Sequence, residues 1–515
     1  MEFLLTAIPG GGGGAVAAAA AAVGTVAAAA ALAEKAGIVE MGHKGRSNAP
    51  PAVPGLPIIG NLHQLKERKP HKTFSNWSET YGPIYTIKTG SSSVAVLNSR
   101  EVAKEAMVTK FSSISTRKLP TAISVLSHDK SMVAVSDYND FHKMVKRLIM
   151  AGMLGVSAQR KFRETRDTMM NNLLSTLRAL VNDDPHSPLN FREVFKDELF
   201  RLSLIESIGE DVSSVYVEEF GREVSKEEIY QATVVDMMMC AIEVDWRDFF
   251  PYFSWVPNKS FEERVFTAES RRTAMVLALV RQQKKRIEHG EAKISYLDLM
   301  LSENGDLTDD QLTMLVWEAL IESTDTTLVT TEWAMYELSK NPEIQNRLYQ
   351  EIQQVCGDKT VTEDDLRRLP FLNAVFNETL RYYSPVPLVP PRFVHETTEL
   401  GGYEVPAGTQ MFINLYGCNM NKKDWEEPEQ WRPERFLDGS FSDVDLFKTM
   451  AFGGGKRVCS GAMQATNISC TAIARLVQEF AWRLKEGDEN NVETISLTSF
   501  KLHPLHVHVS PRATK

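Results

Sequence analysis

The segment from Phe452 to Gly461, FGGGKRVCSG, constrains the fold more than any other stretch of the 515-residue chain. Its three consecutive glycines allow backbone angles that other residues resist, and they let the chain approach a flat surface closely. The residues after Cys459 favour the start of a helix. A thiolate at a helix N-terminus is stabilised by the helix dipole and by free backbone N–H groups. The segment therefore predicts a cysteine ligand facing a flat bound group, with Arg457 available to pair with a carboxylate of that group.

A single thiolate is one of the axial ligands of haem iron, and it favours O–O cleavage. At every fixed position, Phe-x-x-Gly-x-Arg-x-Cys-x-Gly, the segment resembles the haem-binding signature of the cytochrome P450 superfamily. The resemblance implies the P450 fold, which is mainly α with a small β region in one large catalytic domain. It also implies haem b, with Cys459 as the ligand to iron. Expected haem-binding residues besides Cys459 are Phe452, Gly455, Arg457, Gly461, His142, Lys146 and Arg392.

Two of these positions depart from the superfamily pattern. Its usual tryptophan and arginine fall at His142 and Lys146, which are i, i+4 neighbours on one helix face. Both side chains can still bind a haem propionate, although lysine offers a point charge where arginine offers a fork. The basic run around them, residues 142–147, is equally compatible with a surface that docks the electron donor.

Charge and cysteine usage narrow the class of protein further. The formal net charge of −10 argues against nucleic acid as the main partner, because phosphate binding requires a clustered positive surface. The five cysteines are scattered and include no C-x-x-C pair, so they indicate a reducing compartment and not a disulfide framework. Hydrophobic residues make up 43% of the chain, which is ample for a large buried core.

The N-terminal leader carries no charged residue from Phe3 to Ala33 and is rich in alanine. Its length suits a bilayer span of roughly 20 residues, although alanine makes such a span marginal and a low-complexity leader is the alternative. We expect residues 1–33 to be a membrane anchor, 34–57 a basic and proline-rich hinge, and 58–515 the catalytic domain. The expected membrane is the endoplasmic reticulum, or alternatively the plastid outer envelope, with the catalytic domain in the cytosol.

Helical patterns dominate from about Arg100 to Glu378. One long helix is predicted from Thr308 to Ser339, because Thr308 and Gln311 resemble a capping box and Asn341-Pro342 ends the pattern. Strands are predicted at Ile84–Lys88, Ser93–Leu97, Gly402–Val405, Gln410–Asn414 and Leu505–Ser510.

The middle of the long helix holds Ser323-Thr324-Asp325-Thr326-Thr327, a cluster of poor helix formers. Hydroxyl groups there can bond back to helix carbonyls and loosen the helix. The superfamily resemblance implies that Thr326, with Asp325 as its neighbour, delivers protons to bound dioxygen. Glu322-Ser323 stands where the superfamily often has Ala-Gly. The glutamate alters the local polarity.

A second constellation pairs Glu378 with Arg381 at i, i+3, and Arg435 follows downstream in PERF. An i, i+3 ion pair taken alone is a common surface feature. The superfamily resemblance implies that these three residues form a buried structural network behind the haem.

Within plant monooxygenases the chain resembles the ent-kaurene oxidases. This resemblance rests on residues Asn48–Phe74, Phe111–Arg117, Met237–Phe250, Thr326–Met335 and Pro387–Phe393. It implies NADPH-driven oxidation of one methyl group of ent-kaurene through alcohol and aldehyde to ent-kaurenoic acid, for gibberellin synthesis, with a P450 reductase as electron donor. The alternatives are a paralogue that hydroxylates a related diterpene for defence compounds, and a haem-thiolate isomerase or dehydratase.

A hydrocarbon substrate has no polar handle, so shape and apolar contact must orient it. Expected pocket-lining residues are Ile123, Val125, Leu126, Met238, Ile242, Leu320, Ser323, Thr324, Val386, Leu388, Val389 and Phe500. A methylene-sized difference in shape discriminates by only about 1–3 kcal/mol, so a few substitutions can move the oxidised carbon.

Overall fold

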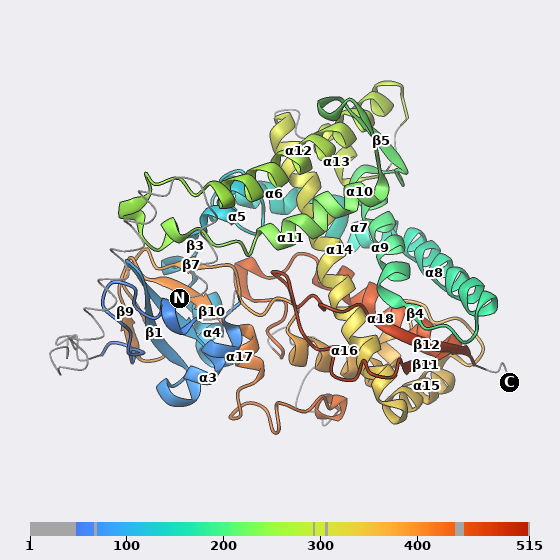
Figure 1. The fold of residues 1–515 in the computed structure, drawn as a ribbon. Coiled ribbons are helices and arrows are strands. Elements are labelled where there is room, and N and C mark those ends of the chain that lie inside the picture. Colours follow the sequence, from blue (N-terminus) through green and yellow to red (C-terminus); the bar gives the residue numbers. More distant parts are fainter. Residues whose placement is uncertain (1–47, 66–68, 292–293, 304–306, 438–447, 513–515) are drawn as a thin grey trace.

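In the computed structural model, the described residues are 48–65, 69–291, 294–303, 307–437 and 448–512. A large helical body lies beside a smaller region of sheet (Figure 1), which confirms the predicted mainly α fold with a small β region. None of the helices in these described ranges is long and apolar enough to cross a membrane. The predicted anchor, residues 1–33, lies outside the described residues.

The α-helices are α3 (His71–Tyr81), α4 (Arg100–Lys104), α5 (Thr121–Leu126), α6 (Asp140–Ile149), α7 (Val156–Lys161), α8 (Arg163–Asp183), α9 (Phe191–Ile208), α10 (Lys226–Tyr230), α11 (Asp236–Cys240), α12 (Lys259–Glu288), α13 (Tyr296–Glu303), α14 (Asp309–Lys340), α15 (Pro342–Cys356), α16 (Pro370–Tyr383), α17 (Leu415–Asn419) and α18 (Ala462–Glu479). The strands are β1 (Ile84–Thr89), β2 (Ser92–Leu97), β3 (Thr116–Arg117), β4 (Leu189–Asn190), β5 (Ser214–Val217), β6 (Arg222–Ser225), β7 (Arg392–Phe393), β8 (Thr398–Leu400), β9 (Tyr403–Val405), β10 (Gln410–Ile413), β11 (Phe480–Leu484) and β12 (His506–Pro511).

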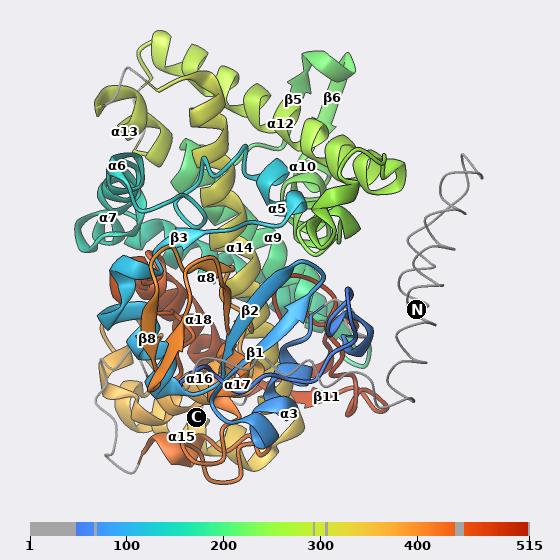
Figure 2. The same cartoon turned by 90° about the vertical axis from the view of Figure 1, so that its left-hand side faces the viewer.

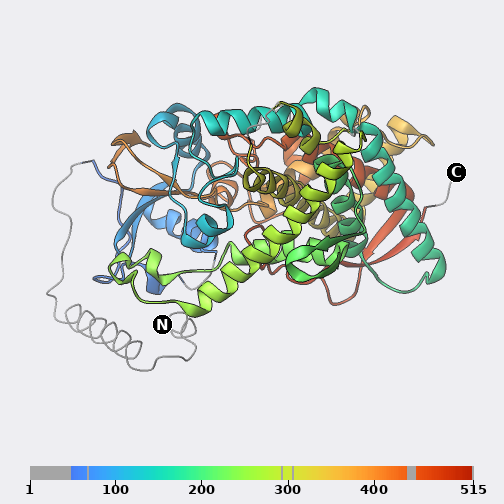
Figure 3. The same cartoon turned by 90° about the horizontal axis from the view of Figure 1, so that it is seen from above.

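The central helix α14 runs through the middle of the body, as Figures 1 and 2 both show. Its first turn is closed by the predicted capping box, in which the Thr308 side chain accepts from the Gln311 backbone and the Gln311 side chain accepts from the Thr308 backbone. At 32 residues it is about 48 Å long, enough to span the molecule. The long α12, yellow-green in Figure 3, packs against it.

Two large hydrophobic cores meet along α14. Residues of its N-terminal half, from Leu312 to Ile321, belong to a core shared with α12 and α13. Residues from Leu328 onward belong to a second core shared with α16 and α18. The hydroxyl-rich stretch Ser323–Thr327 lies between the two cores, so its polar groups do not interrupt either one.

The main sheet has the strand order β1-β2-β10-β7-β3 and joins segments far apart in sequence. β10 pairs with β2 in parallel, whereas the other pairings are antiparallel. Arg392 on β7 is the register partner of Arg117 on β3, so the sheet places two arginines side by side. The described end of the proline-rich segment packs on this sheet as well, since Ala52 forms a bridge with Thr86.

Candidate active site

A cavity of ≈ 2190 Å³ lies between α14, the sheet and the cysteine loop, residues 452–461. Small-molecule pockets typically measure about 300–1,000 Å³, so this cavity has room for a large cofactor together with a substrate. Its walls are mostly apolar and come from α5, α11, α14 and the proline-rich segment 385–391. Cys459 lines one end of it.

The cysteine loop is fixed by its own backbone. The Cys459 N–H donates to the Phe452 carbonyl at 2.9 Å, which closes the loop just before α18. Gly455 has φ +66°, and a Cβ there would lie 2.3 Å from the Met107 carbonyl oxygen. Both the positive φ and the close approach to Met107 therefore require glycine at this position. Gly455 was expected to be a haem-binding residue, but it packs against Met107 and does not line the cavity. From α6, Lys146 donates to the carbonyls of Lys456 and Val458 and so ties the loop to the helix.

The Cys459 side chain is surrounded by protein, yet its free surface opens into the cavity. Burial, followed by the nearby carboxyl group of Glu322, raises the pKa of this thiol to about 11. The Gly461 N–H donates to the sulfur, and with the charge of Lys146 it acts in the opposite direction. A bound metal cation deprotonates a coordinating thiol outright, so the loop has the donor set for a metal–thiolate bond.

Four cationic or potentially cationic side chains gather beside the loop, and several of their nitrogens lack partners. Within the part of the chain that the structure describes, Nε of Arg117, Nε2 of His142, and both Nε and Nη1 of Arg392 and Arg457 are buried without a hydrogen bond. Burial, and then the charges of Arg392 and Arg457, lowers the pKa of Arg117 well below its usual value. Burial and the neighbouring cations lower the pKa of His142 to about 4.

Buried donors that lack acceptors are costly, and crowded like charges add to that cost. A planar group whose carboxylates lie beside these cations would accept hydrogen bonds from the unbonded donors and would neutralise the like charges. Haem b carries two propionates, and the cysteine loop supplies the thiolate. The residues present therefore fit haem. The group would be held by the unpartnered nitrogens on one side and by the Cys459 sulfur on the other.

The wall formed by α14 presents Thr326 and Ser323 to the cavity. The Thr326 hydroxyl donates back to the Glu322 carbonyl at 3.1 Å, and Ser323 donates to the Ala319 carbonyl at 2.6 Å. The expected back-bonding is thus present, but the helix stays continuous through it. Asp325 lies behind this wall, where it bonds to Thr498, and burial raises its pKa to about 6.

The predicted pocket residues divide into two sets. Those that line the cavity are Ile123, Leu126, Met238, Ile242, Ser323, Val386, Leu388 and Val389. Val125, Leu320, Thr324 and Phe500 do not, and we correct their assignment here. Leu320 and Thr324 are fully buried on an adjoining face of α14 that turns away from the cavity, Val125 packs against the adjoining core, and the Phe500 ring lies under Arg192.

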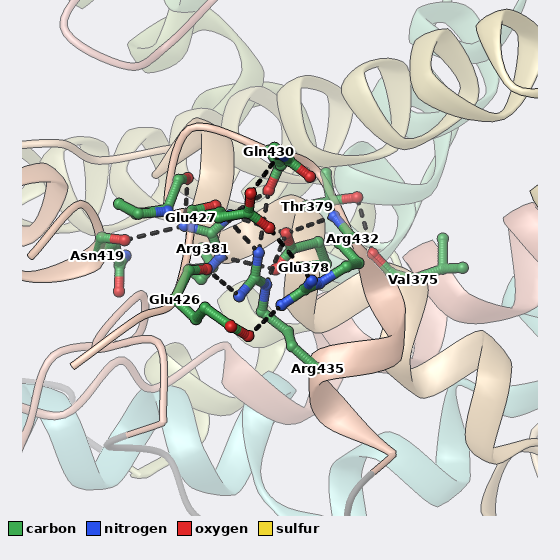
Figure 4. Close-up of polar contacts among 11 residues, drawn as sticks. Val375, Glu378, Thr379, Arg381, Asn419, Glu426, Glu427, Gln430, Arg432 and Arg435 are labelled. Atoms are coloured by element: carbon green, nitrogen blue, oxygen red, sulfur yellow. Dashed lines mark hydrogen bonds and ion pairs between the residues drawn. The ribbon is translucent and has the colours of Figure 1, made fainter. Parts of the chain in front are cut away.

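Glu378, Arg381 and Arg435 do meet, in a buried network that Figure 4 shows. Arg381 forms a two-pronged ion pair with Glu378, each N–O distance being 2.7 Å, and also donates to three backbone carbonyls. Arg435 reaches the same carboxylate at 3.1 Å. Neither Glu378 nor Arg381 has any exposed surface. The network joins α16 to the segment between α17 and the cysteine loop.

A thiol-bearing loop before a helix, a central helix over a large cavity and a cluster of cations with buried, unbonded nitrogens together define a haem-thiolate protein. A family model described as Cytochrome P450 matches residues 50–510, so the chain belongs to the cytochrome P450 family. It is 71% identical to Ent-kaurene oxidase 2 of Oryza sativa subsp. japonica, over 94% of this chain and 95% of the relative. It is 73% identical to Ent-kaurene oxidase-like 3 and 64% identical to Ent-sandaracopimaradiene 3-hydroxylase, both of the same organism and each over 90% of this chain and 92% of the relative.

These relatives place the chain in the plant ent-kaurene oxidase group of that family. The protein is a diterpene-oxidising monooxygenase that binds haem through a cysteine thiolate and uses electrons derived from NADPH. The sequence analysis did not include Arg117 in the group of cations that gather beside the cysteine loop. Arg117 ends the segment Phe111–Arg117, which the sequence analysis used only for the family resemblance. Its position beside Arg392 depends on the pairing of β3 with β7, which the sequence does not show.

Proposed function

We propose that this monooxygenase converts ent-kaurene to ent-kaurenoic acid by three successive oxidations of one methyl group, the reaction of gibberellin synthesis. The observation that carries the proposal is the 71% identity to Ent-kaurene oxidase 2 over nearly the whole of both chains. The cavity supports it, because its walls are mostly apolar and a hydrocarbon must be oriented by shape.

In this proposal Cys459 is the haem ligand, and Arg117, His142, Arg392 and Arg457 hold the haem propionates. The bound haem supplies oxygen activation. Thr326 holds a proton at its hydroxyl oxygen on the cavity wall, and Asp325 replenishes it from the Thr498 side of α14. Glu378, Arg381 and Arg435 keep the fold of the haem site.

The substrate assignment predicts the outcome of one incubation. With a plant P450 reductase and NADPH, the protein is expected to convert ent-kaurene first to a primary alcohol and then to the acid, as identified by mass spectrometry. In a parallel incubation with ent-sandaracopimaradiene, product formation is expected to be at least tenfold slower. The reverse preference would support the second candidate, hydroxylation of a related diterpene, which the 64% identity to Ent-sandaracopimaradiene 3-hydroxylase favours.

The proton-delivery role of Thr326 predicts an uncoupled variant. Thr326→Ala is expected to consume NADPH at a similar rate while forming about tenfold less product per NADPH, with the difference released as hydrogen peroxide. The matched control is Thr331→Ala, which loses the same kind of back-bond to a helix carbonyl but lies fully buried away from the cavity. Equal coupling in both variants would remove the role from Thr326.

A membrane location and the reductase partner complete the proposal. We propose that residues 1–33 anchor the protein in the endoplasmic reticulum, with the plastid outer envelope as the alternative, and that the catalytic domain lies in the cytosol. The basic run on α6 is the proposed docking surface for the reductase.

A further inference from the structure

Two glutamates on α14 form a carboxyl pair that the roles above leave unexplained. Glu318 and Glu322 are one helical turn apart, and their carboxyl groups hydrogen bond to each other. Glu318 is 1% exposed, and its two oxygens accept the backbone N–H groups of Val133 and Ala134, each at 2.8 Å. These two donors stabilise a negative charge on Glu318.

Two buried carboxyl groups in contact cannot both ionise without a large penalty, so they share a proton. Burial, and then the charge of Glu318, raises the pKa of Glu322 well above its usual value. Burial raises the pKa of Glu318 as well, but the backbone N–H groups of Val133 and Ala134 oppose this rise, and the structure shows no such backbone donors at the Glu322 carboxyl among the described residues. The shared proton therefore resides on Glu322, which keeps a neutral carboxylic acid at neutral pH.

The acid points into the cavity next to the place of reaction. Glu322 lies deep in the protein, yet its side chain has free surface because the cavity opens beside it. It stands one helical turn before Thr326 on the same face of α14. Glu322 is near enough to Cys459 to influence the pKa of that thiol, so an oxygen atom on a substrate at the Cys459 side of the cavity lies near this carboxyl group.

We propose that Glu322 is a specificity-determining residue whose single acidic O–H turns from Glu318 to the oxygen of the diterpene alcohol formed in the first oxidation, and retains that alcohol for the next. Glu318 can release this O–H because its two oxygens still accept the backbone N–H groups of Val133 and Ala134. The inference rests on the proposed function, since only a multistep oxidation needs an oxygenated intermediate to stay. An aldehyde oxygen accepts the same bond. The final product is a carboxylate at neutral pH, and its negative charge is repelled by Glu318, so it leaves.

Equilibrium binding tests this without turnover. The full-length, haem-loaded protein is titrated with ent-kaurene and with its primary alcohol, and the ligand-induced change in haem absorption gives a Kd for each. Three variants are compared with the wild type. Glu322→Leu removes the donor, Glu322→Gln keeps a donor of the same shape, and Glu322→Ala is a second apolar variant with the residue that the superfamily often carries there.

The leucine variant is expected to bind the alcohol about tenfold more weakly while its Kd for ent-kaurene changes less than twofold, because only the alcohol loses a buried hydrogen bond. The glutamine variant is expected to restore alcohol binding to within about threefold of wild type. If leucine prevents haem incorporation, the alanine variant gives the same comparison. An equal change for both ligands, or a glutamine variant as weak as the leucine one, would overturn the inference.

If the proposed substrate is wrong, the titrations give a different result from the one expected if only the role of Glu322 is wrong. If the wild type binds neither ent-kaurene nor its alcohol, the proposed function is wrong, and the titrations are repeated with ent-sandaracopimaradiene and its 3-alcohol. Selective loss of the alcohol in Glu322→Leu would then still support a donor at residue 322. Loss of neither ligand, or of both equally, would exclude it.

Discussion

Replacement of Cys459 by alanine is expected to abolish the red-shifted carbonyl band of the reduced protein and at least 99% of diterpene oxidation. A thiolate ligand donates electron density to iron, which shifts that band and favours O–O cleavage. Cys459 is the cysteine at the end of the cavity, where the Gly461 N–H and Lys146 face its sulfur. The measurement is the difference spectrum of the reduced, carbon monoxide-treated variant, together with haem content.

The control for this variant is Cys470→Ala. Cys470 lies on α18, the helix that begins just after Cys459, and is fully buried in the core away from the cavity. Its replacement removes one sulfur from the same part of the protein, so the carbonyl band is expected to stay in place. An unchanged band in Cys459→Ala, or a lost band only in Cys470→Ala, would end the assignment of Cys459 as the ligand.

Local sequence rules were sufficient for the elements that carry the site. The capping box at Thr308 and Gln311 placed the start of α14, and alternation placed β1, β2 and β10 to within one residue at each end. These features depend on residues that are neighbours along the chain, so the sequence alone contains the needed information.

The cavity face of α14 was predicted less well, for a reason that lies in helix geometry. Residues four apart share a face, so Leu320 and Thr324 point together into the core, while Ser323 and Thr327 line the cavity. The sequence shows which residues share a face but not which face the cavity adjoins, because that depends on where α9 and α12 pack.

The cluster of cations also depends on tertiary structure and could not be predicted from local patterns. Arg117, His142, Arg392 and Arg457 come from β3, α6, β7 and the cysteine loop, so no local pattern links them. That each of them has at least one buried nitrogen without a hydrogen bond among the described residues is visible only when the chain is folded. The Glu318–Glu322 pair could be predicted from the sequence only in part. The spacing shows that the two side chains are neighbours, but only the fold shows the N–H donors of Val133 and Ala134 that hold the charge on Glu318.

Glu378→Gln is expected to cause the largest loss of stability among these changes, about 3–5 kcal/mol in the free energy of unfolding. The substitution keeps the side-chain volume but removes the carboxylate that Arg381 and Arg435 share. Within the described ranges, no other carboxylate forms an ion pair with either of these two buried guanidinium groups. We expect little haem-loaded protein at the normal growth temperature, and a steep drop in the denaturant midpoint of what is recovered. The measurement is haem content per protein together with denaturant unfolding.

The control for this variant is an exposed ion pair, which shows how much of the lost stability depends on burial and how much on loss of the charge alone. Arg163 and Asp364 also form a two-pronged ion pair, with N–O distances of 3.0 and 2.7 Å, but the Asp364 side chain is 77% exposed. Asp364→Asn makes the same carboxylate-to-amide change and is expected to leave the free energy of unfolding nearly unchanged, because water solvates the arginine that remains. If both variants lost the same free energy of unfolding, the Glu378 network would contribute no more stability than a surface ion pair does. The proposal that it maintains the haem site would then have to be abandoned.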